Sequence, residues 1–146
     1  VYGRGGGSCE AFLKLARLPI LPLPDGGRFD LQPVHAEDVA DGLARLLNAP
    51  SAHGSVIHMT GRLKLTLADY LNLLRQTVHR KPSFQTASIP LPLLRPMLPL
   101  ANLLSDGFLS PDSITLLQQG SCADTAAFAA LLEREPLGAD EFYRLD

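Results

Sequence analysis

The chain has 146 residues, a formal net charge of -2 and 46% hydrophobic residues. This composition is typical of one soluble globular domain and excludes a disordered chain, which would be rich in charge and poor in apolar residues. A nearly neutral chain offers no electrostatic footprint for phosphates, so we expect no nucleic-acid partner. The two cysteines, Cys9 and Cys122, cannot form a disulfide framework, which favours a reducing, cytoplasmic location.

Helices alternate with short extended segments up to about residue 90, and helices alone follow. In the first half, the expected elements are a glycine-rich loop at 3–7, a helix over 9–18 capped by Ser8, an apolar run at 20–23, a turn at 24–27, an extended segment at 29–35 and a helix that begins with Glu37 and Asp38. This order predicts an α/β body with a helical tail, in which a few short strands accompany about five to seven helices.

In the second half of the chain, further short extended segments and helices are expected. Its expected elements are a strand at 55–60, a helix capped by Thr66 with Asp69 at its N3 position, an extended segment at 84–89, a kinked apolar helix over 91–105, helices that begin at Ser110 and Asp124, and a last short helix over 138–143. The pattern contains no repeat and no low-complexity tract.

The segment 89–109 is the most apolar part of the chain, but prolines at 90, 92, 96 and 99 interrupt it. Since proline in a helix interior costs roughly 3 kcal/mol, we do not expect a membrane-spanning helix there. One interpretation is a kinked helix over the core. The other is the wall of a hydrophobic cleft, or a segment lying against a membrane surface. The N-terminus also has no basic and apolar signal-peptide pattern, so none is expected.

Few residues carry a catalytic pattern of their own. The glycines at 3–7 could cradle a phosphate, but Ser8 stands where the dinucleotide fingerprint needs its last glycine. His35 and Asp38 lack a third metal ligand at a familiar spacing, so we expect no metal site. Cys9 follows a glycine loop, and a lone cysteine is more often a small core residue than a nucleophile. We therefore assign no catalytic residue.

Three motifs in order carry a resemblance. They are Val-Tyr-Gly at 1–3, Pro-Val-His-Ala-Glu-Asp-Val-Ala at 33–40, and Val-Ile-His-Met-Thr-Gly at 56–61 followed by Leu-Thr. This order resembles the C-terminal portion of extended and atypical short-chain dehydrogenase/reductases, within the NAD-dependent epimerase/dehydratase superfamily. The tail from Leu109 to Phe128 is similar to the branch that includes relatives of the complex I accessory NADH-dehydrogenase subunit.

The resemblance implies the C-terminal part of an NAD(P)-binding Rossmann-type protein, with residues 1–146 as one substrate-side domain and the dinucleotide-binding part absent. It places Tyr2 and Gly3 near the NAD or NADP of the full-length parent, and Arg4, His35 and Asp38 on the substrate side. The family's glycine fingerprint and Tyr-x-x-x-Lys pair lie upstream, and no lysine here follows a tyrosine by four residues. We therefore expect the chain alone to bind no cofactor and to be inactive.

Position 31 bears on the substrate. Nucleotide-sugar epimerases usually carry an arginine four residues before the motif histidine, whereas this chain has Leu31. Leucine cannot make a bidentate phosphate contact, which favours a small hydrophobic, quinone- or isoprenoid-like substrate. The expected partners are the missing Rossmann portion and a second copy of the chain. The alternative function is a non-catalytic interaction or assembly module of a respiratory or membrane-associated complex, peripheral to the membrane.

Overall fold

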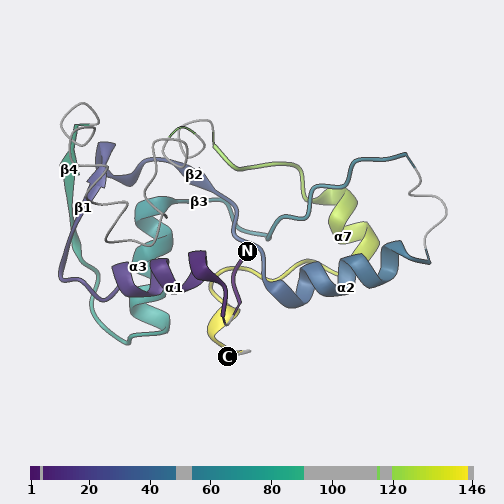
Figure 1. Ribbon diagram of the computed structural model, residues 1–146, viewed down its shortest axis with the longest axis horizontal. Coiled ribbons are helices and arrows are strands. Elements are labelled where there is room, and N and C mark those ends of the chain that lie inside the picture. Colours follow the sequence, from purple (N-terminus) through teal and green to yellow (C-terminus); the bar gives the residue numbers. More distant parts are fainter. Residues whose placement is uncertain (4, 49–53, 91–114, 116–119, 145–146) are drawn as a thin grey trace.

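The computed structural model describes residues 1–3, 5–48, 54–90, 115 and 120–144. Figure 1 shows an elongated molecule with a mixed α/β end and an all-helical end. The elements are α1 (Gly7–Leu15), β1 (Ile20–Pro24), the 3-10 turn η1 (Asp25–Gly27), β2 (Asp30–Leu31), α2 (Ala36–Leu46), β3 (Leu65–Thr66), α3 (Leu67–Thr77), β4 (Gln85–Ile89), α7 (Ala126–Leu132) and the 3-10 turn η4 (Phe142–Arg144). The predicted α/β class is confirmed.

Two short sheets hold the mixed end together. β1 and β4 pair in parallel from Ile20 opposite Gln85 to Pro24 opposite Ile89. β2 and β3 pair antiparallel, with Asp30 opposite Thr66. Because β3 runs directly into α3, this second pairing fixes where α3 begins. In Figure 1 the β1–β4 pair stands at one end of the molecule, beside α1 and α3.

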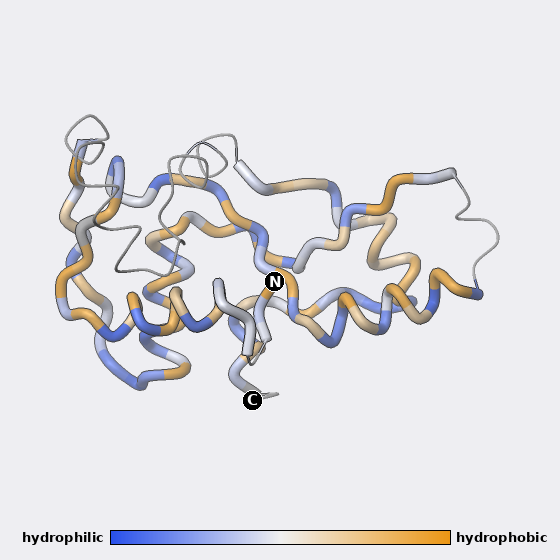
Figure 2. The backbone as a smooth tube through the Cα atoms, in the orientation of Figure 1, coloured by the Kyte–Doolittle hydropathy of each residue, from blue (hydrophilic) through white to orange (hydrophobic). Residues whose placement is uncertain are grey.

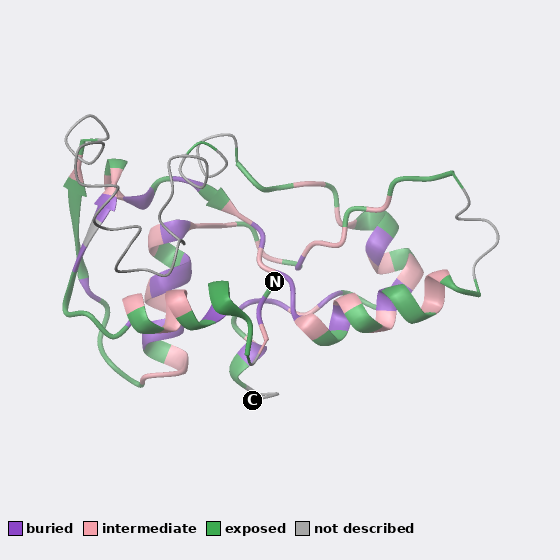
Figure 3. Ribbon diagram, viewed as in Figure 1, coloured by how far each residue is buried: buried purple, intermediate pink, exposed green. Residues whose placement is uncertain are grey.

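The buried side chains form three clusters. Figure 3 marks the buried residues in purple along the ribbon. The first two fill the mixed end, and α3 contributes to both. The third lies between α2 and α7 and contains Val34, Phe128 and Leu132, against which Ile57 and Met59 pack. The members of the first two clusters are Tyr2, Cys9, Ala16, Tyr70, Leu74, Ala139 and Phe142, and Leu21, Leu23, Phe29, Leu67, Leu71 and Phe84. Figure 2 shows the hydrophobic and hydrophilic residues alternating around the turns of α2, as a helix with one buried face requires.

A buried arginine joins α1 to α3. The Arg75 guanidinium donates to the carbonyl oxygens of Ala16 (2.9 Å) and Leu18 (2.8 Å), just beyond the end of α1. Its Nε donates to Pro82 O at 2.6 Å, in the loop that leads to β4. Three carbonyl oxygens thus compensate the charge in place of a carboxylate, and they satisfy acceptors that a helix end leaves unpaired.

The helix starts differ in how well the sequence predicted them. Thr66 caps α3 as predicted, since its hydroxyl accepts the Asp69 N–H at 3.1 Å. Ser8 does not cap α1, because that helix begins at Gly7 and Gly6 is the N-cap, without a side-chain hydrogen bond. Asp124 Oδ1 accepts from the Ala126 N–H, but Thr125 occupies the N-cap position of α7.

Two predicted elements are wrong in type. Residues 55–60 form no strand, because no described segment pairs with their backbone. The last helix, expected over 138–143, is a turn followed by the 3-10 turn η4. The apolar segment 91–109 lies outside the described residues, as does the helix expected from Ser110 apart from Thr115. The part of the chain that the structure describes has no helix long and apolar enough to cross a membrane.

We expect Thr66→Ala to lower the free energy of unfolding by about 1 kcal/mol, because the Asp69 N–H loses its acceptor at the start of α3. Urea denaturation followed by circular dichroism measures this loss. Ser83→Ala is the matched control, since Ser83 is exposed in the loop before β4. Equal stability of the two variants would mean that the Thr66 cap does not stabilise α3.

Candidate functional site

The N-terminal residues pair with the segment that leads into α2. The Tyr2 N–H donates to Val34 O at 2.8 Å, and the Ala36 N–H donates to Tyr2 O at 2.7 Å, which makes Tyr2 and His35 a parallel bridge. Gly3 follows at the point of closest approach, where a Cβ would come within 2.8 Å of Ala36 Cβ. The chain therefore requires a small residue at position 3, and both residues expected near a cofactor, Tyr2 and Gly3, lie beside His35.

His35 acts as the N-cap of α2. Its Nδ1 accepts the Glu37 N–H at 3.2 Å, so the proton of a neutral ring resides on Nε2. The ring is buried against Tyr2 and Phe142, with ring centroids 5.7 and 5.3 Å away, and Tyr2 stacks on Phe142 at 4.9 Å. Nε2 is buried and has no hydrogen-bond partner among the described residues. The ring thus combines a helix cap with one unsatisfied donor.

Asp38 follows one turn later and is fully buried. Its Oδ2 accepts the Leu137 N–H at 2.8 Å, and its Oδ1 lies 2.7 Å from Arg134 Nη2 as an ion pair whose angles fall short of a hydrogen bond. The same Arg134 nitrogen lies 3.4 Å from Asp41 on the next turn. Both carboxylate oxygens of Asp38 therefore engage the C-terminal segment, and they fasten it to the start of α2.

A buried glutamine closes the neighbouring part of the site. Gln32 Nε2 donates to Gly61 O (2.9 Å) and Thr125 Oγ1 (2.7 Å), and Oε1 accepts the Ala123 N–H at 2.9 Å. Gly61 approaches so closely that a Cβ there would overlap the carbonyl oxygen of Pro33. One side chain thus joins three segments that are far apart in the sequence.

The buried phenol of Tyr70 does not suit acid–base chemistry. Burial raises the pKa of Tyr70 above its ordinary value, so the phenol stays protonated at neutral pH. No three metal-ligating side chains gather anywhere in the described ranges. Cys9 is buried and Cys122 is exposed, and both are free thiols.

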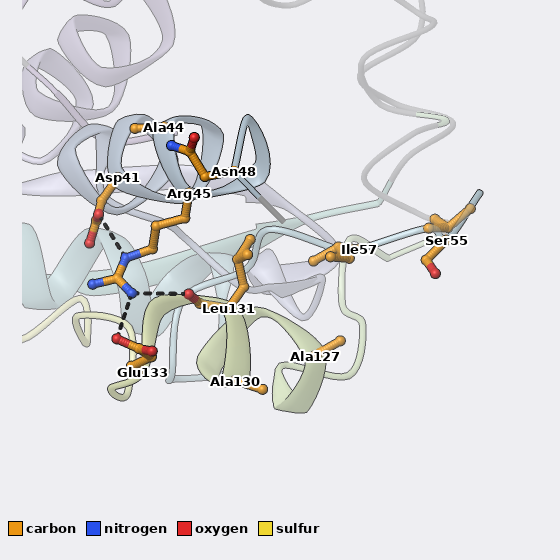
Figure 4. Close-up of a pocket in the computed structure, with 11 residues that line it drawn as sticks. Asp41, Ala44, Arg45, Asn48, Ser55, Ile57, Ala127, Ala130, Leu131 and Glu133 are labelled. Atoms are coloured by element: carbon orange, nitrogen blue, oxygen red, sulfur yellow. Dashed lines mark hydrogen bonds and ion pairs between the residues drawn. The ribbon is translucent and has the colours of Figure 1, made fainter. Parts of the chain in front are cut away.

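A groove with a volume of about 820 Å³ lies elsewhere, between α2, α7 and residues 55–57. Figure 4 shows Arg45 at one end of it, reaching Asp41 and the segment that follows α7. Arg45 bonds Asp41 Oδ1 (3.0 Å) and Glu133 Oε2 (2.9 Å), and these bonds, Glu133 first, raise the pKa of the guanidinium. Tyr2, Gly3, His35 and Asp38, the described residues expected to bind cofactor or substrate, do not line this groove.

The structure thus gathers four of the five expected site residues at one place, the start of α2: Tyr2, Gly3, His35 and Asp38. The fifth, Arg4, lies outside the described residues. The sequence did not indicate Gln32, Arg134 and Phe142, which complete this cluster. A glutamine between Leu31 and Pro33 in the expected extended segment was the one available signal, because a buried amide needs several partners.

Comparison with known proteins supports the fold. No family model and no curated protein matches the chain. Nine chains of solved structures do match, among them three with TM-scores between 0.58 and 0.69. The first is a nucleoside-diphosphate-sugar epimerase from Staphylococcus aureus, with a TM-score of 0.61 and 16% identity over 92% of this chain and 47% of the epimerase.

The second is an NADPH-dependent quinone oxidoreductase from Escherichia coli, with a TM-score of 0.69 and 14% identity over 93% of this chain and 49% of that protein. The third is gox2253, with a TM-score of 0.58 and 18% identity over 94% of this chain and 40% of that protein. The chain shares their fold. It spans about half the length of the proteins it matches.

We expect Asp38→Ala to lower the free energy of unfolding by about 2–3 kcal/mol, since the Leu137 N–H loses a charged acceptor. The ion pair adds little to this figure, because Arg134 is 44% exposed. Glu37→Ala is the matched control: it removes an exposed acid from the same helix turn, worth about 0.3–1 kcal/mol through the helix dipole. Denaturant titration of both variants measures the difference, and equal losses would contradict the anchoring role of Asp38.

Proposed function

We propose that this chain is the substrate-side part of an NAD(P)-dependent oxidoreductase or epimerase-like protein, in which a dinucleotide-binding part completes the site. The observation that carries the proposal is the coverage of the structural matches. More than nine-tenths of this chain matches an epimerase and a quinone oxidoreductase, yet it spans less than half of each. The partner that we propose, the dinucleotide-binding part, corresponds to the half of those proteins that this chain does not cover.

Within this proposal, the site is the backbone edge at Gly3, Ala36 and Glu37. Gly3 and the first turn of α2 are partly or fully accessible, whereas Tyr2, His35 and Asp38 are buried. The three buried residues, Tyr2, His35 and Asp38, therefore contribute by holding the accessible residues in place. Tyr2 and Gly3 hold the edge that faces the nicotinamide of NAD or NADP, and His35 and Asp38 hold the substrate side, to which Arg4 belongs by its place in the sequence.

The substrate proposed is small and hydrophobic. Leu31 is half-buried in β2, opposite Leu65, and packs against two of the apolar clusters. Its side chain therefore offers no hydrogen-bond donor to a diphosphate at the position where nucleotide-sugar epimerases usually carry an arginine. One structural neighbour is a quinone oxidoreductase by name, which favours a quinone-like molecule. A cytoplasmic location fits a soluble cofactor.

A non-catalytic interaction module is the second candidate. The observation that favours it is that polar atoms of the site residues already have partners within the chain. His35 Nδ1 and both Asp38 carboxylate oxygens bind groups of the chain itself. Such a module would keep the packing of the fold and need no chemistry. The sequence of the dinucleotide-binding part decides between the two, because an oxidoreductase requires the Tyr-x-x-x-Lys pair there.

We expect the chain alone to show no dehydrogenase activity and no measurable binding of NADH or NADPH, because its glycine loop lacks the spacing that cradles a pyrophosphate. Isothermal titration calorimetry with each nucleotide measures this. Micromolar binding of either nucleotide to the isolated chain would overturn the proposed division between the two parts.

We expect a short-chain benzoquinone to shift the backbone amide signals of Gly3, Ala36 and Glu37 in NMR spectra, because these residues form the accessible surface of the site and the Ala36 and Glu37 amides are bonded to its buried residues. A uridine diphosphate sugar is the control ligand and should leave them in place, since Leu31 gives it no phosphate contact. Shifts with the nucleotide sugar and none with the quinone would contradict the proposed substrate class.

A further inference from the structure

Exposed cations gather where the end of α1 meets the loop between α3 and β4. The buried Arg75 joins these two segments, since its guanidinium donates to Leu18 O and to Pro82 O. His79 Nε2 adds a contact of 2.9 Å to Leu13 O. Each exposed cation is the sequence neighbour of one of these contacting residues. The cations, which we call the basic patch, are Lys14, Arg17, Arg80 and Lys81.

The positive charge of the basic patch is local and opposes the sign of the whole chain. Residues 11–24 and 70–90 contain no aspartate or glutamate, although the chain has a net charge of -2. None of the four cations forms an ion pair with a residue that the structure describes, whereas Arg45, Arg62 and Arg134 all do. Figure 1 shows the two segments side by side at the end of the molecule opposite α7, and Figure 2 shows the loop between α3 and β4 as mostly hydrophilic.

Exposed aliphatic side chains directly follow the cations of α1. Leu18 is 43% and Ile20 63% exposed, and Pro19 between them is exposed as well. Ile20 pairs with Gln85 at the start of β1, so the sheet holds this end of the segment in place. Lysine and arginine have apolar stems and hydrated charges, which suit the boundary between water and lipid when aliphatic side chains lie beside them.

A protein partner fits this surface less well than a membrane does. Contact with the dinucleotide-binding part would remove water from four cations, which is costly unless each one meets a carboxylate. Lysine is also depleted at protein interfaces, and two of the four cations are lysines. At a membrane surface the cations keep much of their water and are attracted by the negative potential of anionic lipids. The edge at Gly3, where we propose that the dinucleotide-binding part joins, precedes the start of α1, whereas the patch lies at its end.

We propose that the basic patch, together with Leu18 and Ile20, docks this chain on the surface of a membrane that contains anionic lipids. The cations pair with the phosphate groups of the lipid headgroups, and the two aliphatic side chains enter the layer beneath them. Docking of this kind requires no spanning helix. The inference does not depend on the proposed enzymatic function, although it brings the chain to the membrane in which a quinone-like substrate dissolves.

Co-sedimentation of the full chain with vesicles tests the proposal. We expect binding to vesicles of phosphatidylcholine mixed with phosphatidylglycerol, little binding to vesicles of phosphatidylcholine alone, and release at high ionic strength, which screens the charges. Arg17→Gln combined with Lys81→Gln should weaken binding by about 25-fold, because each cation near an anionic surface contributes about fivefold. Ile20→Ser should also weaken binding, but without changing its dependence on salt.

Arg28→Gln combined with Lys64→Gln is the matched control, since it removes the same charge from exposed positions outside the patch. It should leave vesicle binding unchanged, and unchanged circular dichroism shows that both double variants are folded. Equal weakening by the two double variants would overturn the proposal, because net charge alone would then drive binding. So would a chain that binds no anionic vesicle, that binds neutral vesicles equally well, or that binds duplex DNA more tightly than anionic vesicles. Nucleotide and quinone binding have separate readouts, so docking can fail while the proposed function stands.

Discussion

The buried carboxylate of Asp38 is the interaction on which the rest of this structure depends. An unpaired carboxylate in an apolar interior would cost several kcal/mol, and here the Leu137 N–H and Arg134 compensate it. Those partners come from the C-terminal segment, which is therefore drawn across the first turn of α2. Phe142 then stacks on Tyr2, and both rings cover His35. One acidic residue thus links the start of α2 to both ends of the described chain.

This arrangement explains how residues without catalytic character can still define a site. His35 and Asp38 use their polar atoms to hold backbone, and what they leave accessible is the edge at Gly3, Ala36 and Glu37. Precise placement of a backbone edge is a contribution that a substrate-side part can make without supplying a nucleophile or a base. The shared fold with an epimerase and a quinone oxidoreductase is consistent with that role, since one scaffold can carry different substrates.

Local signals in the sequence were enough for the elements whose causes are local. The Thr66 cap, the acid-rich start of α2 after His35 and the extended segment that forms β4 were predicted because caps, charges and local residue patterns act over a few residues. The site cluster was partly predicted, but only through the resemblance of the motifs that contain Tyr2 and His35. The cap predicted at Ser8 was wrong, because a residue type suited to capping does not fix the start of a helix when the glycine loop before it offers several possible starting positions.

The remaining features depend on contacts between distant segments. Gln32 bonds Thr125 across 93 residues, and Asp38 reaches Leu137 across 99, so no sequence window contains either pair. Residues 55–60 are an element that the sequence predicted and the structure does not form. Their alternating pattern is that of a strand, but a strand also needs a partner backbone, and pattern alone says nothing about whether one is present.

Native-state hydrogen exchange at two amides tests the central claim most directly. The Ala36 N–H is bonded to Tyr2 O and the Leu137 N–H to Asp38 Oδ2, so they report on the N-terminal and C-terminal attachments to the start of α2. If Asp38 makes these attachments one cooperative unit, both amides open with the same free energy, and Asp38→Ala lowers that energy for both. A Leu137 amide that exchanges much faster than Ala36, or an Ala36 amide unaffected by Asp38→Ala, would contradict it.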